Sequence, residues 1–303
     1  MKAPFPYFGG KRKVADEVWQ RLGNVPYYVE PFVGSAAVLL ARPEVPHGMT
    51  INETIGDVDG HVVNVWRSLK HRPETVARCC SDPPNSIDMA ARREVLLDAD
   101  DWLVGALEGD PEQCFPDIAG YWIYNQSCFM AAGKSDRGVC TPRMWRNGMG
   151  VCRFRNDEEL RAALCQLGTR LRYVVMAHGD WKRTVSDKTL HSHGIAGVFL
   201  DPPYGVEDRH ELYAHDDRDV SAEVFKWAID NQDCPLLRIA VCGYEGEHDF
   251  PETWEKLKWK SHGFVGKRGS QGRENREKER IWFSPNCLKQ DPHQLELFEE
   301  EVP

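Results

Sequence analysis

The 303-residue sequence has no run of about 18 or more apolar residues, the length that predicts a transmembrane helix. Its N-terminal Met1-Lys2-Ala3-Pro4 is also not followed by an apolar core of the kind that signal peptides carry. We therefore expect a protein without membrane association that is not secreted. Apolar residues make up 41% of the chain, which is enough for the core of one large domain, with or without a smaller insertion.

The sequence also lacks Cys-x-x-Cys pairs, although it contains ten cysteines. Structural zinc ligands usually come in such close pairs. The widely spaced Cys128, Cys140, Cys152 and Cys165 leave a zinc site conceivable, but they favour small buried thiols in a reducing compartment. We expect no metal.

Positive charge is scarce overall, because the net charge is -9. Binding to nucleic acid needs Lys and Arg, so this balance alone does not favour it. However, two segments, 134–155 and 267–280, hold a local excess of basic residues, whereas acids gather in 82–117 and 291–301. This distribution fits local binding of a polyanion as well as it fits ordinary solvated surface.

The first third of the chain alternates between helical and strand patterns. A glycine turn follows its first predicted strand and Asp57 follows its second, which is typical of a nucleotide-binding α/β sheet. The apolar periodicity predicts helices over 11–22, 35–42 and 61–70 and strands over 27–29 and 50–55.

Strand patterns disappear after residue 72 and return near residue 173. Helical patterns persist between them, over 89–106 and 118–129, and strands are again expected over 173–177, 198–200, 236–242 and 281–283. The sequence predicts an α/β catalytic domain of residues 1–72 and 166–288, a mainly helical insertion of residues 73–165, and a flexible acidic tail of residues 289–303.

Asp201-Pro202-Pro203-Tyr204 directly follows a predicted apolar strand, the place where α/β sheets bind ligands. The exocyclic amino nitrogen of adenine or cytosine is a poor nucleophile, because its lone pair is delocalised into the ring. A carboxylate and a carbonyl held by proline can accept both amino hydrogens and free that lone pair. A neighbouring aromatic ring can stack on the base. The tetrapeptide therefore indicates amino-group methylation.

Glu30-Pro31-Phe32-Val33-Gly34-Ser35-Ala36 forms the second motif. Gly34 and the small residues after it allow the backbone to approach a ligand at the start of a helix. Asp57 follows Gly34 by 23 residues, which is close to the usual spacing between such a glycine turn and an acid that binds ribose hydroxyls. The full three-glycine fingerprint is missing, which argues for a ligand other than a dinucleotide.

Together these motifs resemble those of the Dam-type, or D12-class, DNA adenine N6-methyltransferases. Pro6–Lys11 resembles the N-terminal cofactor motif of that family, and His178–Asp180 resembles the acid near the adenine of the cofactor. The resemblance implies a Rossmann-like methyltransferase sheet with an inserted, mainly helical target-recognition module. It also implies that S-adenosylmethionine contacts Tyr7, Lys11, Glu30, Phe32, Gly34, Asp57, Asp180 and Asp201, and that Asp201, Pro202, Pro203 and Tyr204 are catalytic.

The middle module departs from the loop for a four-base palindrome that better-known relatives carry. Arg and Asn can read base edges and Trp can wedge between bases, although phosphate contact is equally open. The loop 266–280 corresponds to a segment near the flipped base and is expected to hold the phosphate backbone. The candidate DNA-binding residues are Arg137, Arg143, Trp145, Arg146, Asn147, Lys267, Arg268, Arg273 and Arg276.

These observations predict an enzyme that methylates N6 of a flipped adenine in double-stranded DNA, with full or loose site specificity. N4-cytosine or RNA amino-group methylation is an alternative, and a catalytically silent DNA-binding or clamp-recruited protein is another. C5-cytosine methylation is disfavoured, because it needs a Pro-Cys nucleophile and the sequence has no Pro-Cys dipeptide.

The resemblance implies a monomer in the cytoplasm of a bacterial or phage-infected cell. Restriction-modification, phage self-protection and replication marking all fit such an enzyme. In the acidic tail, Gln294-Leu295-Glu296-Leu297-Phe298 resembles the peptide with which bacterial proteins bind the replication sliding clamp. A chance match of five residues is the alternative.

Overall fold

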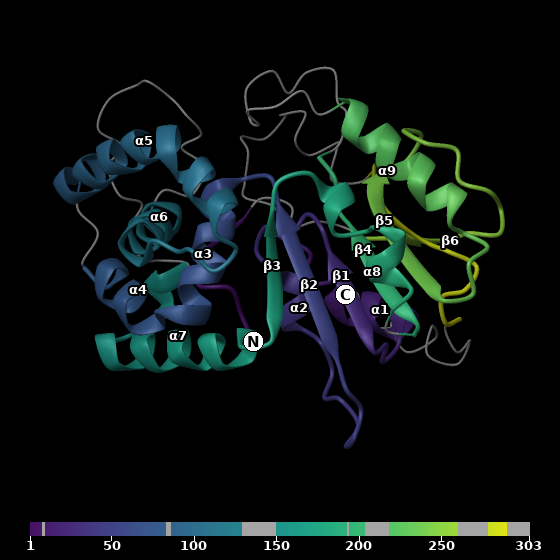
Figure 1. The fold of residues 1–303 in the computed structure, drawn as a ribbon, viewed down its shortest axis with the longest axis horizontal. Coiled ribbons are helices and arrows are strands. Elements are labelled where there is room, and N and C mark those ends of the chain that lie inside the picture. Colours follow the sequence, from purple (N-terminus) through teal and green to yellow (C-terminus); the bar gives the residue numbers. More distant parts are fainter. Residues whose placement is uncertain are drawn as a thin grey trace, which may run out of the picture.

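The computed structural model describes residues 1–7, 10–82, 86–128, 150–192, 194–203, 218–259 and 278–289. A seven-stranded mixed sheet runs through the described chain in the order β3-β2-β1-β4-β5-β7-β6 (Figure 1). Neighbours among β1 to β5 are parallel, and β7 is antiparallel to both β5 and β6. The strands are β1 (Tyr27–Glu30), β2 (Asn52–Asp57), β3 (Val174–His178), β4 (Ala196–Leu200), β5 (Leu237–Tyr244), β6 (Glu255–Lys258) and β7 (Glu279–Phe283).

The strand order reverses between β1 and β4. From β1 the chain proceeds outward to β2 and β3, and it then crosses to β4 and proceeds the other way. This is the arrangement of a Rossmann-like sheet, in which ligands bind beyond the carboxyl ends of the strands at the reversal. The predicted α/β fold class is confirmed, and its topology puts Glu30 and Asp201 at the edge of the sheet where such folds bind ligands.

One face of the sheet is covered by α1 (Ala15–Leu22), α2 (Ala37–Leu40) and α3 (Gly60–His71). Tyr28 of β1 is fully buried there with apolar residues of all three helices. The side chain of Asp59 caps α3 by accepting hydrogen bonds from the amides of His61 and Val62. The helix predicted over 35–42 is shorter than expected, because Gly34 and Ala36 have positive φ angles of 41° and 50° and delay its start to Ala37.

The opposite face is covered by η2 (Trp181–Arg183), α8 (Asp187–Leu190) and α9 (Arg218–Asp230). Here the alternate residues of β1, Tyr27 and Val29, pack with apolar residues of these elements. Burial on both faces explains why the strands are apolar at consecutive positions. The helix α9 was not predicted from the sequence.

Between α3 and β3 the described chain is helical, and its helices stand together beside the β3 edge of the sheet (Figure 1). They are α4 (Pro73–Cys80), α5 (Ser86–Gly109), α6 (Pro116–Cys128), η1 (Gly150–Arg153) and α7 (Asp157–Leu171). Asn156 caps α7 by accepting a hydrogen bond from the Glu159 amide. α7 runs across residue 165, where the sequence analysis ended the insertion, and the division into domains stays a prediction. No helix in the described parts of the chain has the length and hydropathy needed to cross a membrane.

Candidate active site

The predicted ligand-binding residues come together at one edge of the sheet. Glu30 and Asp57 end β1 and β2, His178 ends β3, and Asp201 directly follows β4. These strands are adjacent and parallel, so their carboxyl ends lie along the same edge. Residues separated by more than 100 positions in the sequence therefore form one candidate site.

Lys11 and Asp201 form an ion pair at the reversal point. The ammonium nitrogen of Lys11 lies 2.7 Å from Oδ2 of Asp201, and their side chains are 3% and 20% exposed. Burial lowers the pKa of Lys11, but the negative charge of Asp201, with smaller contributions from Cys242 and Glu279, raises it above its ordinary value. Lys11 is therefore a cation that is already bound to the predicted catalytic carboxylate.

Pro202 is buried and Pro203 is half-buried after β4, whereas Tyr204 lies outside the described residues. The structure thus places Asp201, Pro202 and Pro203 at the predicted edge of the sheet. It gives no account of the aromatic position of the motif.

Asp57 organises the turn that follows β1. Its Oδ2 accepts a hydrogen bond of 3.0 Å from the Gly34 amide, and its Oδ1 accepts one of 3.0 Å from the Asp59 amide. The indole nitrogen of Trp66 donates to the Gly34 carbonyl at 2.9 Å. Burial, followed by the nearby charge of Asp59, raises the pKa of Asp57 to about 7. The turn and the acid are therefore one preformed unit.

Tyr7 covers the same turn from the N-terminal segment. A Cβ atom built on Gly34 would lie 2.5 Å from Cε1 of Tyr7, so the close approach requires glycine. The N-terminal segment is itself fixed, because the guanidinium of Arg153 donates to the Ala3 carbonyl at 2.9 Å. The terminal ammonium of Met1 donates to the Leu40 carbonyl at 3.1 Å.

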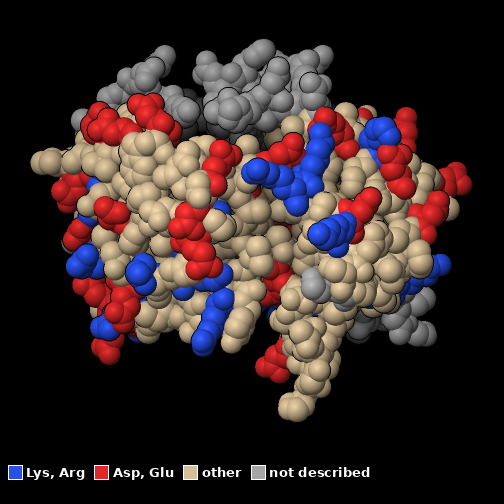
Figure 2. Space-filling model, viewed as in Figure 1, with Lys and Arg blue, Asp and Glu red and all other residues tan. Residues whose placement is uncertain are grey.

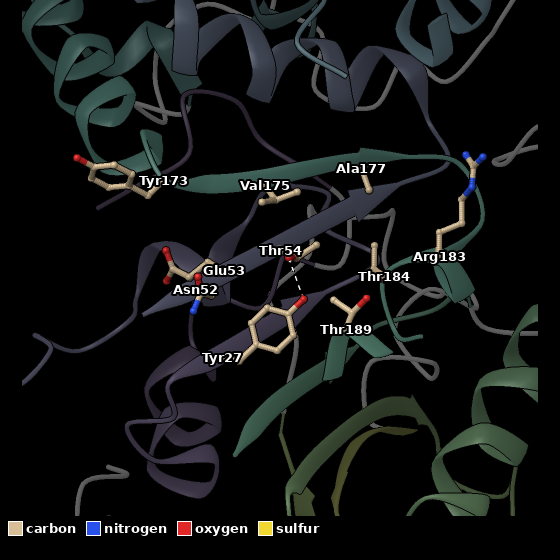
Figure 3. A pocket seen from close by; sticks show the side chains of 10 residues that line it. All are labelled: Tyr27, Asn52, Glu53, Thr54, Tyr173, Val175, Ala177, Arg183, Thr184 and Thr189. Atoms are coloured by element: carbon tan, nitrogen blue, oxygen red, sulfur yellow. Dashed lines mark hydrogen bonds between the residues drawn. The ribbon is translucent and has the colours of Figure 1, made fainter. Parts of the chain in front are cut away.

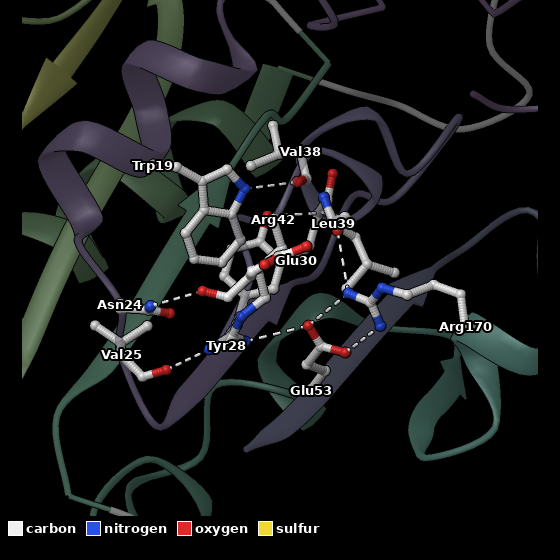
Figure 4. A network of polar contacts seen from close by, with 11 residues as sticks. Trp19, Asn24, Val25, Tyr28, Glu30, Val38, Leu39, Arg42, Glu53 and Arg170 are labelled. Atoms are coloured by element: carbon white, nitrogen blue, oxygen red, sulfur yellow. Dashed lines mark hydrogen bonds and ion pairs between the residues drawn. The ribbon is translucent and has the colours of Figure 1, made fainter. Parts of the chain in front are cut away.

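The carboxylate of Glu30 points into the core. Its Oε2 accepts hydrogen bonds from the Tyr28 hydroxyl at 3.0 Å and from the Leu39 amide at 3.1 Å (Figure 4). Burial raises the pKa of Glu30 to about 8. Glu30 thus ties α2 to β1, and its predicted contact with the cofactor stays a prediction.

A second buried network fixes β2 beneath the site. The carboxylate of Glu53 is 4% exposed and accepts two hydrogen bonds from Arg170, at 2.6 and 2.7 Å, and one from Arg42 at 3.1 Å (Figure 4). Arg170 lies on α7, so this pair joins the helical part of the chain to the sheet. Such bidentate pairs are geometrically specific.

The remaining predicted cofactor residues lie along the same edge. The ring centroids of Phe32 and Trp181 are 6.1 Å apart. Asp180 caps η2, where its Oδ1 accepts a hydrogen bond of 2.9 Å from the Lys182 amide. The predicted contacts of Phe32 and Asp180 with the cofactor stay predictions.

Sequence reasoning missed Val58 and Trp66. Val58 follows Asp57 directly and is 57% exposed, so its side chain is accessible beside the predicted ribose-binding acid. The signal in the sequence for Val58 was its place directly after Asp57, the acid predicted to bind ribose hydroxyls. Trp66 is fully buried on the apolar face of α3 and holds the Gly34 turn through its indole nitrogen. Hydrophobic periodicity predicts its burial but does not indicate this hydrogen bond.

The predicted DNA contacts lie outside the described residues. Of the basic residues in the segments 134–155 and 267–280, Arg153, Arg155, Lys278 and Arg280 are described; Arg153 donates to the Ala3 carbonyl and Arg280 binds the Glu245 carboxylate. On the face shown in Figure 2, described basic and acidic side chains are interspersed. The undescribed candidates are Tyr204, Arg137, Arg143, Trp145, Arg146, Asn147, Lys267, Arg268, Arg273 and Arg276, and so is the proposed clamp peptide Gln294–Phe298.

A separate hollow of about 340 Å³ lies on the face of the sheet rather than at its edge (Figure 3). It is floored by residues of β1, β2 and β3, including Tyr27, Thr54 and Val175, and the Tyr27 hydroxyl lies 3.0 Å from Oγ1 of Thr54. The short η2 and α8 leave this part of the sheet partly open, so Val175 is 58% exposed. None of the predicted catalytic or cofactor residues lines the hollow.

No group of His, Cys, Asp and Glu side chains in the described ranges is arranged to hold a metal ion. The cysteines whose side chains are described, for example Cys80 and Cys242, are free thiols. Cys128, Cys140 and Cys152 are not among them, so the zinc alternative stays open on those positions.

Three comparisons with known proteins bear on the resemblance to the D12 class of methyltransferases. Two solved structures of the rRNA methyltransferase aviRa from Streptomyces viridochromogenes match with 17% and 15% identity, each over 93% of this chain and 87% of that chain. Their TM-scores of 0.35 are too low to support an argument. No curated protein matches the chain. Residues 7–132 match the model of the D12 class N6 adenine-specific DNA methyltransferases, and this match confirms the resemblance to that family that the motifs indicate.

Proposed function

We propose that the protein transfers a methyl group from S-adenosylmethionine to N6 of an adenine in double-stranded DNA. The observation that carries this proposal is the ion pair of the buried Lys11 with the half-buried Asp201, 2.7 Å apart, at the reversal of the strand order. This arrangement sets a carboxylate at the edge of the sheet where folds of this kind hold nucleotide-like cofactors. The family match over residues 7–132 agrees with it.

The residues at the edge of the sheet fit S-adenosylmethionine. The turn at Gly34 has no Cβ and its amide is fixed by Asp57, so its backbone can approach a ligand closely. Asp57 would accept hydrogen bonds from the ribose hydroxyls through its remaining lone pairs. Val58 would pack against the adenine ring, and Tyr7 would cover the methionine side. The bound cofactor supplies an electrophilic methyl group on a sulfonium.

Asp201 and Pro202 would hold the target amino group. While Lys11 binds Oδ2 of Asp201, the Asp201 carboxylate would accept one amino hydrogen and the Pro202 carbonyl would accept the other. These two hydrogen bonds would make the lone pair available, so that the bond from N6 to the methyl carbon forms as the sulfonium S–C bond breaks. S-adenosylhomocysteine would leave, and one amino proton would be released to solvent. An adenine inside a duplex cannot reach this edge, so the base has to be flipped out, and Tyr204 would stack on it.

The other elements of the proposal rest on the sequence. The basic segments 134–155 and 267–280 would contact DNA, and residues 294–298 would bind a sliding clamp. We also propose that the enzyme acts as a monomer in the cytoplasm. Site specificity would come from the helical insertion.

The proposal is tested by incubating the purified protein with S-adenosylmethionine and mixed-sequence duplex DNA, followed by nucleoside mass spectrometry. We expect N6-methyladenine from the wild type and a loss of roughly a thousandfold in Asp201→Ala. Asp187→Asn, an exposed substitution on α8, serves as the control and should retain full activity. Formation of N4-methylcytosine, modification of RNA alone, or undiminished turnover by Asp201→Ala would overturn the proposal.

A further inference from the structure

Lys11 lies near a buried aromatic ring as well as near Asp201. Its ammonium nitrogen lies 5.5 Å from the centroid of the Trp259 ring, within the range of a cation–π interaction. Trp259 directly follows β6 and is 7% exposed, and Lys11 is 3% exposed. The cation is thus held between an aromatic ring from one end of the sheet and the carboxylate that follows β4.

A buried ammonium is costly unless its surroundings replace the water that it has lost. Asp201 replaces part of that water with a hydrogen bond. An indole ring supplies negative electrostatic potential on its face, and Trp is the strongest such partner among the aromatic residues. The aromatic face therefore stabilises the cation in the place where it also bonds Asp201.

The indole nitrogen of Trp259 makes no hydrogen bond to any described residue. A buried indole usually has a partner for this nitrogen. Because none is found among the described residues, the contact of Trp259 with Lys11 is made by its ring and not by its N–H group. Replacement of Trp259 by Phe would therefore keep the aromatic face without breaking a described hydrogen bond. This property provides a matched control for the experiments below.

We propose that Trp259 is a positioning residue that holds Lys11 against Asp201, so that the catalytic carboxylate is presented in one orientation to the target amino group. The inference rests on the proposed function and deepens it. It adds a residue from the end of β6 to a site that the motifs build from the N-terminal segment and β4. Trp259 acts on Asp201 only through Lys11.

Steady-state kinetics separate this role from simple packing. We expect Trp259→Leu to lower kcat roughly tenfold and to leave KM for both substrates within about twofold, because the substitution changes the orientation of the Asp201 carboxylate rather than the binding of substrates. Trp259→Phe should stay within about threefold of the wild type. An equal loss in the Leu and Phe variants would show that the volume of the indole matters rather than its aromatic face, and would overturn the proposal.

A double-mutant cycle with Lys11→Met tests whether Trp259 acts through Lys11. If it does, Trp259→Leu should cost nothing further once the cation is gone, so the double variant should match Lys11→Met alone. Losses that multiply would show that the two residues act independently and would overturn the proposal. Thermal unfolding of each variant confirms that it is folded, and Trp259→Met replaces Trp259→Leu if the latter has no cooperative transition.

Chemical labelling tests the contact without relying on methyl transfer. Lys11 should react with acetic anhydride much more slowly than the exposed Lys13, as read by mass spectrometry. Trp259→Leu should raise the labelling of Lys11 at least severalfold, and Trp259→Phe should not. If the wild type methylates nothing while labelling behaves as expected, the proposed function fails and the positioning of Lys11 stands. If Lys11 in Trp259→Leu stays as protected as in the wild type, the positioning role fails.

Discussion

The amide of Gly34 donates a hydrogen bond of 3.0 Å to Oδ2 of Asp57, which joins the turn after β1 to the end of β2. The second oxygen of the same carboxylate accepts the Asp59 amide at 3.0 Å. Asp57 therefore shapes the turn before any ligand binds. Because Asp57 holds the turn, removal of its side chain would alter the fold as well as its proposed contact with the ribose, so a conservative substitution is needed to test that contact.

Asp57→Asn should weaken binding of S-adenosylmethionine by roughly one to two orders of magnitude, because one amide N–H of the turn then faces an NH2 group instead of an acceptor. Titration calorimetry measures this affinity. Asp59→Asn is the matched control, since Asn caps a helix as well as Asp does and the backbone amide of residue 59 is kept. Equal affinities for the wild type and Asp57→Asn would contradict the assigned role.

The pKa of Asp57, which burial raises to about 7, gives the wild type a pH dependence that the Asn variant lacks. A protonated carboxyl has fewer free lone pairs for ribose hydroxyls, so the affinity of the wild type should fall as the pH drops below about 7. The affinity of Asp57→Asn should be flat over the same range. Calorimetry at several pH values in buffers of equal ionic strength distinguishes the two profiles.

Gly34→Ala should unfold more easily than the wild type by more than about 2 kcal/mol, because the new methyl group meets both a left-handed backbone and the Tyr7 ring. Ala36 also has a positive φ angle, and Ala36→Gly removes that strain at the loss of one methyl group. The second substitution should therefore cost much less. Denaturant unfolding of both variants tests this difference. A small loss of unfolding free energy in Gly34→Ala would show that the turn can rearrange.

The edge of the sheet could be predicted because each of its motifs follows a strand. Burial on both faces produced apolar runs that identify β1, β4 and β5, and a parallel sheet brings their carboxyl ends together whatever lies between them in the sequence. Pairings across the sheet were not predictable. Lys11 meets Asp201 and Trp259 only because the N-terminal segment crosses the edge of the sheet, and no local pattern encodes that path.

Glu30→Gln should change the pH dependence of stability. Burial raises the pKa of Glu30 to about 8, from an ordinary value of 4.5. Between these two pH values the folded protein binds more protons at this site than the unfolded chain, so stability falls as the pH rises through that window. Gln carries no such proton, and Glu30→Gln should gain stability relative to the wild type from about pH 5 to about pH 8, by up to about 1.4 kcal/mol for each pH unit.

Thermal melts of both proteins across that range measure the difference. Groups that do not interact with Glu30 titrate equally in the wild type and in Glu30→Gln, so their contributions cancel in the difference between the two proteins. A constant difference in melting temperature from about pH 5 to about pH 8 would show that Glu30 does not titrate there.

Glu53→Ala should be among the most destabilising substitutions on β2, because it leaves the buried guanidinium of Arg42 and that of Arg170 without a carboxylate. Removal of one partner from a buried pair costs about 3–5 kcal/mol. Arg161 on the same helix as Arg170 forms an exposed pair with Glu74 at 2.8 Å, and Glu74→Ala is the matched control that should leave the melting temperature nearly unchanged. Guanidinium chloride is unsuitable here because it screens charges, so urea unfolding is the measurement. Equal losses in the two variants would show that Glu53 contributes no more than a surface ion pair, and that α7 is held to the sheet by its apolar contacts alone.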